Sequence, residues 1–212
     1  MTQTLSVRAR FERFPATVKG AFILRGEDSD PHQVVLGQAR IVPVPGGPGR
    51  RIAIASSTLD VAPRTDVFVP FESAVGDLEP GWYELECELE VDGVRGVYPG
   101  GPRFSVAWPR ASTRRGAIPV KRAVDVDGVR VTVEQLDCAA DHATVHLRAV
   151  PPTELTVTLT ADRSSVPVLD VQRDDERGAV TVTSYPILKS HRALDIGVRV
   201  GRASGSVEVP LP

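Results

Sequence analysis

Polar and apolar residues alternate without interruption over one segment in the first half of the chain. From Tyr83 to Val91 every second residue is apolar, and each residue between them is a glutamate. Because successive side chains of a β-strand point to opposite faces, the segment predicts a strand with one apolar and one acidic face. The apolar face carries Tyr83, Leu85, Cys87, Leu89 and Val91, and the acidic face carries Glu84, Glu86, Glu88 and Glu90.

Similar short runs recur along the chain. They are rich in Val, Ile, Phe and Thr, they are separated by clusters of Gly, Pro, Asp and Ser, and no long segment has a helical period. Before residue 110 they predict strands at 5–11, 18–24, 33–44, 51–56, 65–71, 82–91 and 103–108, with a turn at 91–95 and a hairpin loop at 98–102. After residue 118 they predict strands at 129–133, 143–149, 155–160, 166–171, 179–183, 194–200 and 206–209. The chain is therefore predicted to be all-β.

Residues 110–117 interrupt this pattern. They contain three arginines and no apolar alternation, so they predict a basic linker between two domains, 1–109 and 118–212. All the aromatic residues except Tyr185 precede residue 110. The first domain is therefore expected to have aromatic residues in its core, and the second domain to have a core rich in valine.

The turn Leu78-Glu-Pro-Gly-Trp-Tyr83, which leads into the alternating strand, resembles the E–F corner of immunoglobulin-like and fibronectin-III-like sandwiches. The resemblance implies that the Tyr83 ring is buried and that its hydroxyl bonds to nearby backbone. Residues 129–137 and 143–149 look like the paired early strands of bacterial immunoglobulin-like domains. The fold class expected from these resemblances is two tandem immunoglobulin-like antiparallel β-sandwiches, an architecture that by itself implies no particular function.

Composition limits the possible partners and the compartment. The net charge is −2, which gives no overall attraction to nucleic acid or to an anionic membrane. The N-terminus lacks the apolar core of a signal peptide, and no run approaches the roughly 18 apolar residues of a membrane span. We therefore expect a cytoplasmic protein. Cys87 and Cys138 fall in different predicted domains, so no structural disulfide is expected.

The glutamate row admits two interpretations. It is typical of a solvated sheet face, whose charges would pair with neighbouring strands through Arg8 and Arg10 or through Arg103. It is also a negatively charged stripe, about 20 Å long, that suits a basic partner. A glycosidase pair is disfavoured, because two carboxylates on a convex face lack a cleft that would raise the pKa of one of them.

The histidines give weak signals of a site. His142 and His146 are four residues apart, which spans roughly 13 Å on a strand and is too far for one shared metal ion. Asp141 and Cys138 near His142 leave a loop site open as an alternative. His32 and the other loop histidine, at position 191, are expected at the surface.

Other polar segments also favour structural roles. Residues 27–32 hold three carboxylates that could ligate calcium, but they lack the glycine and the terminal glutamate of an EF-hand loop, so a polar turn is expected. The chain contains no Gly-x-Ser-x-Gly elbow, and the glycine-rich residues 45–51 lack the ending of a phosphate-binding loop. The basic residues at 110–122 are expected to bridge the two acidic domains rather than to bind phosphates.

These observations predict a non-catalytic intracellular interaction or scaffold protein, with no catalytic residues, no metal and no cofactor. A protein partner or self-association is expected, and neither nucleic acid nor membrane. The predicted partner-binding residues are Trp82, Glu84, Glu86, Glu88 and Glu90. Two alternatives remain open: an accessory or regulatory subunit of an enzyme complex, and a carbohydrate- or ligand-binding module. The second would need Trp82, Tyr98 and Trp108 to form one exposed platform.

Overall fold

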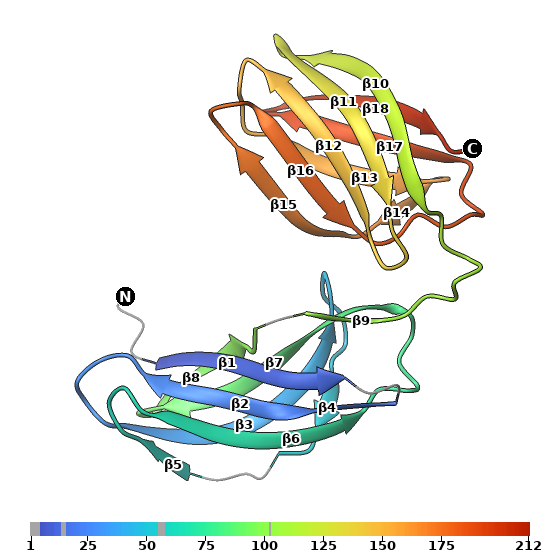
Figure 1. Cartoon of the computed structure of the whole chain (residues 1–212). Helices are drawn as coiled ribbons and strands as arrows, with labels where there is room; N and C mark the ends of the chain where they lie inside the picture. The colour runs from blue at the N-terminus through green and yellow to red at the C-terminus, as the bar shows by residue number, and fades with distance from the viewer. Residues whose placement is uncertain (1–4, 14–15, 55–57, 102) are drawn as a thin grey trace. The chain divides into compact units, whose positions relative to one another are not determined.

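The chain folds into antiparallel β-sheets. The computed structural model describes residues 5–13, 16–54, 58–101 and 103–212, and these residues form strands and no helix (Figure 1). The chain divides into two compact units, Met1–Val106 and Ala107–Pro212. The prediction of an all-β protein is confirmed.

The first unit contains two facing sheets. One sheet has the order β1-β2-β6, and the other has the order β4-β3-β7-β8, with β5 beside β3 and β9 beside β7. Every pairing between these strands is antiparallel. The strands are β1 (Leu5–Arg13), β2 (Thr17–Gly26), β3 (His32–Pro43), β4 (Arg50–Ile52), β5 (Thr58–Val61), β6 (Asp66–Ala74), β7 (Gly81–Val91), β8 (Val94–Pro99) and β9 (Phe104–Val106).

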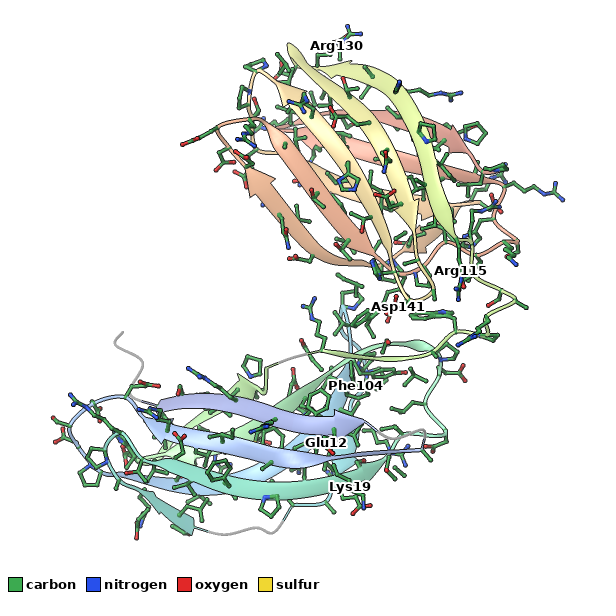
Figure 2. The ribbon with its side chains drawn as sticks, in the orientation of Figure 1. Glu12, Lys19, Phe104, Arg115, Arg130 and Asp141 are labelled. Carbon is green, nitrogen blue, oxygen red and sulfur yellow. The ribbon has the colours of Figure 1, made fainter. Side chains whose placement is uncertain are left out.

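The core of the first unit lies between its two sheets. β7 alternates between buried and half-buried residues along its whole length, as the sequence predicts, with its apolar side chains inward. They meet buried side chains of the opposite sheet, such as Phe22 on β2 and Phe71 on β6, whose ring centroids are 5.0 Å apart. Phe104, labelled in Figure 2, lies within 6 Å of two other rings, at 5.6 Å from Phe11 and 5.8 Å from Tyr83.

The turn before β7 is held by a tyrosine. The Tyr83 residue is 7% exposed, and its hydroxyl donates a hydrogen bond to the backbone carbonyl of Glu79 at 2.8 Å. This bond satisfies a polar group that burial would otherwise leave without a partner. The burial of Tyr83 and the return of its hydroxyl to nearby backbone are both confirmed.

The second unit also contains two sheets. Their orders are β10-β11-β12-β16-β15 and β14-β13-β17-β18. The strands are β10 (Gly116–Val126), β11 (Val129–Cys138), β12 (Ala143–Val150), β13 (Thr156–Ala161), β14 (Ser164–Val166), β15 (Val168–Asp174), β16 (Ala179–Ser184), β17 (Ala193–Val200) and β18 (Ala203–Pro210). Its buried core is built from Val, Leu, Ile, Ala and Cys, as expected.

The predicted linker 110–117 is partly wrong. β10 begins at Gly116, inside that segment, and the Arg114 backbone N–H donates to the Ile187 carbonyl at 2.8 Å. The preceding Trp108 packs edge-on against Tyr185, with ring centroids 5.3 Å apart, so Tyr185 is not the only aromatic residue of the second unit. β10 escaped prediction because a bulge between Pro119 and Arg122 breaks its alternation.

Four other parts of the strand prediction differ from the structure. β5 and β8 were not expected; β8 occupies residues predicted as turn and loop, and its alternation is hidden because most of its residues are exposed. The predicted strand 166–171 is divided between β14 and β15. The predicted strand 51–56 ends at Ile52, and residues 55 and 56 lie outside the described residues.

We predict that Tyr83→Phe lowers the free energy of unfolding by about 1–2 kcal/mol, because it removes the bond to the Glu79 carbonyl and keeps the ring. Urea unfolding of the intact chain measures the change. Tyr98→Phe is the matched control, since the Tyr98 hydroxyl makes no hydrogen bond to the described residues. Equal losses in the two variants would show that the Tyr83 bond does not stabilise the turn.

Candidate functional site

The glutamate row lies on the outer face of the sheet that contains β7, and all four side chains are half-buried. Three of the carboxylates lie within ion-pair distance of an arginine, two on neighbouring strands and one just before β9. The pairs are Glu84 with Arg103 Nε at 3.6 Å, Glu86 with Arg40 Nη2 at 3.5 Å, and Glu90 with Arg95 Nε at 2.8 Å.

Strand register explains two of these pairs. Arg40 on β3 lies directly opposite Glu86, and Arg95 on β8 lies directly opposite Glu90. Pairing of the row with Arg103 is confirmed. Pairing with Arg8 and Arg10 is wrong, because both lie on β1, which pairs with β2 in the other sheet.

Glu88 differs from the other three glutamates. No lysine or arginine of the described residues lies within 4.0 Å of its carboxylate. The register of β3 against β7 shifts between Leu36 and Ala39, so the residues facing Glu88 are Gly37 and its neighbour Gln38. At this bulge Glu88 faces Gly37, which has no side chain, and the uncharged Gln38, and neither residue can form an ion pair with it.

The bulge leaves a hollow beside Glu88. Its volume is about 240 Å³, and its lining includes Val35, Gly37 and Gln38 from β3 together with Leu89 and Arg95. A Cβ atom on Gly37 would lie 2.8 Å from the Glu88 carbonyl oxygen. Only glycine therefore allows β3 to approach β7 so closely.

Two exposed valines flank the row. Val97 on β8 lies directly opposite Glu88 and is 53% exposed, and Val35 on β3 lies directly opposite Glu90 and is 37% exposed. The sequence did not single out either residue, because β8 was not predicted and the position of Val35 opposite Glu90 depends on the register of β3 against β7. The face thus combines paired charges, one carboxylate without an ion pair and two exposed valines.

The structure does not gather the three residues of the suggested aromatic platform. Trp82 is half-buried, opposite Ser105, on the side of β7 that carries the glutamates. Tyr98 lies opposite Cys87 and packs against the core, so it points to the other face of the same sheet. Trp108 belongs to the second unit.

His32 is buried, which contradicts the prediction of a surface histidine. The residue is 6% exposed; its Nδ1 lies 2.6 Å from Asp92 Oδ2, and its Nε2 lies 2.8 Å from Asp28 Oδ1. Asp92 also accepts a hydrogen bond from the Gln33 backbone N–H at 2.9 Å. Because Asp92 occupies the turn between β7 and β8, this histidine clasp joins the start of β3 to the β7–β8 hairpin.

The clasp shifts the pKa values of His32, Asp28 and Asp92. Hydrogen bonds to Asp92 and then to Asp28 raise the pKa of His32 above its ordinary value of 6.5. The hydrogen bond with His32 lowers the pKa of both Asp28 and Asp92 below their ordinary value of 3.8. When both ring nitrogens donate to carboxylates, the imidazole carries a positive charge.

The remaining histidines serve local contacts in the second unit. His146 Nε2 lies 2.9 Å from Asp137, His142 Nδ1 lies 2.9 Å from Asp141, and the His191 ring accepts from a backbone N–H. The described residues contain no group of three His, Cys, Asp or Glu side chains that could hold a metal ion.

Two of the basic residues at 110–122, Arg114 and Arg122, make side-chain contacts within the second unit. Arg114 Nη2 donates to the His191 carbonyl at 3.1 Å, and Arg122 Nη1 donates to the Glu208 carbonyl at 2.6 Å. These two arginines therefore stabilise backbone of the unit to which they belong.

Comparisons with known proteins add little. No protein-family model and no curated protein matches the chain. Among solved structures, a conserved domain protein from Bacillus anthracis has 9% identity and a TM-score of 0.36, with 100% of this chain and 89% of that chain covered. A protein of unknown function from Porphyromonas gingivalis W83 has 16% identity and a TM-score of 0.37, with coverage of 99% and 100%. A marsupial T cell receptor has 12% identity and a TM-score of 0.29, with coverage of 99% and 62%.

These TM-scores carry no argument about function. In the part of the chain that the structure describes, no helix is long and apolar enough to cross a bilayer.

We predict that the histidine clasp makes stability depend on pH. Because the pKa of His32 is raised in the folded state, its contribution is complete below about pH 6.5 and is lost as pH rises through the raised value. The contribution of the two aspartates is present above about pH 4 and is lost as pH falls through their lowered pKa values.

The melting temperature of the intact chain between pH 6 and pH 9 measures this effect. His32→Gln should lower the melting temperature at pH 6 and flatten its decline toward pH 9. His142→Gln is the control, because the side chain of His142 is 39% exposed, against 6% for His32, and contacts a single carboxylate. An unchanged profile in His32→Gln would mean that the clasp does not stabilise the fold.

Proposed function

We propose that the chain is a non-catalytic protein-binding module built from two immunoglobulin-like sandwiches, and that it binds its partner through the outer face of the β4-β3-β7-β8 sheet. Strand order supports the fold assignment. The orders β1-β2-β6 and β4-β3-β7-β8 correspond to the A-B-E and C′-C-F-G strands of such sandwiches. In the second unit, β11-β12-β16-β15 and β14-β13-β17-β18 correspond to A-B-E-D and C′-C-F-G, with β10 added at one edge.

The exposure of Val97 among paired charges is the observation that carries the functional proposal. Protein interfaces combine an apolar centre with arginine-rich polar surroundings. Here Val97 and Val35 flank the β7 row, and arginines from both sides neutralise three of its carboxylates. Those arginines are already held in ion pairs in the free chain. Binding a partner would therefore cost less side-chain conformational entropy than it would if they were free.

The ion pairs on this face make it less acidic than a row of four free glutamates would be. A row with four free carboxylates would attract any basic surface, whereas this face carries local pairs that leave a net negative charge at Glu88. Its specificity would come from matching apolar contacts at Val35 and Val97 together with that one charge.

We predict that Val97→Asp abolishes capture of the protein partner. The intact chain, wild type and variant, is used to capture proteins from native lysate, the bound proteins are identified by mass spectrometry, and the retained protein is purified and rebound. Phe68→Asp is the matched control, since Phe68 is 62% exposed on β6 in the other sheet.

The proposal predicts a stoichiometric protein that wild type and Phe68→Asp retain and that Val97→Asp loses. The retained protein can be a second copy of this chain, in which case Val97→Asp also shifts its sedimentation to monomer. Equal retention by both variants, or loss only in Phe68→Asp, would place the binding surface elsewhere.

A further inference from the structure

We infer that the hollow beside Glu88 receives a lysine or arginine side chain of the protein partner. This inference rests on the proposed function and specifies the chemistry that the partner must present at one position on the face.

The charges on the face favour a cation at Glu88. Within the outer face of the sheet, Glu84, Glu86 and Glu90 each have an arginine at 2.8–3.6 Å. Glu88 has no cation of the described residues within 4.0 Å, and it is half-buried at the mouth of the hollow. A cation supplied from outside would complete the pairing of the row and would be favoured by electrostatic complementarity.

The shape of the hollow also favours a long basic side chain. The hollow of about 240 Å³ has an apolar wall from Val35 and no side chain at Gly37, while the Leu89 side chain points into the core. Lysine and arginine carry their charge on an apolar stem of three or four methylene groups, which can pack on such a wall while the charged end reaches a carboxylate. An apolar side chain would leave Glu88 unpaired on binding, and an acidic one would repel it.

The ion pair between Arg95 and Glu90 leaves Glu88 as the carboxylate that the partner's lysine or arginine would contact. Arg95 also lines the hollow, but its Nε lies 2.8 Å from Glu90. Arg95 therefore forms its ion pair with Glu90 and acts on Glu88 through a weaker Coulombic attraction, so that Glu88 has no direct contact with a cation of the described residues. Glu86, only two residues away on the same face, is already opposite Arg40 and serves as an internal comparison.

The first experiment uses n-butylammonium, which reproduces the end of a lysine side chain, with n-butanol as the uncharged control. Backbone amide signals of the intact chain are followed by two-dimensional NMR during the titration. The inference predicts saturable shifts at Gly37, Gln38 and Glu88 with butylammonium only. These shifts should disappear in Glu88→Gln and persist in Glu86→Gln.

The second experiment measures the affinity of the captured partner for the same two variants. Glu88→Gln should weaken binding at least about tenfold, because it leaves a partner cation buried without its carboxylate, and Glu86→Gln should weaken it less. Wild-type affinity in Glu88→Gln, or absence of saturable butylammonium shifts, would overturn the inference.

The two proposals fail differently. If Val97→Asp abolishes capture while Glu88→Gln binds the partner as wild type does, the face is correct and the role of the hollow is wrong. If butylammonium binds at Glu88 and no protein depends on Val97, the hollow takes a cation but the proposed function is wrong.

Discussion

The packing of one face of β7 into the core determines what its other face presents. Leu85, Cys87 and Leu89 are buried between the two sheets of the first unit. A slip of the strand by one residue would carry these side chains into water and bring glutamates into the core, so its register is fixed. The same register sets Glu86 opposite Arg40 and Glu90 opposite Arg95. The charge pattern of the outer face is therefore a consequence of apolar packing on the inner one.

The bulge in β3 interrupts the regular cross-strand pairing beside Glu88. A regular strand would continue the cross-strand pairing past Glu88, whereas the shift between Leu36 and Ala39 places Gly37 there and opens the hollow. The histidine clasp holds the ends of the same strands, since His32 begins β3 and Asp92 forms the β7–β8 turn. The hollow and Val97 thus lie on strands that are tied together at one end of the sheet.

The sequence predicted the features that local pattern determines. Strict alternation identified β7 and its two faces, and the Leu-x-Pro-Gly-x-Tyr turn identified the buried tyrosine. Features set by register or by distant contacts were missed. The pairing of Glu86 with Arg40 depends on how β3 lies against β7, and the burial of His32 depends on Asp92, 60 residues away. β8 and β10 were missed because exposure and a bulge hide their alternation.

The most direct test of the account is carboxylate footprinting with a carbodiimide and glycine ethyl ester, read by peptide mass spectrometry, on the free chain and on its complex with the captured partner. The account predicts that Glu88 is labelled in the free chain and protected in the complex. Glu12, exposed on β1 in the other sheet (Figure 2), should be labelled equally in both. Equal labelling of Glu88 in both states, or protection of Glu12 in its place, would contradict the account.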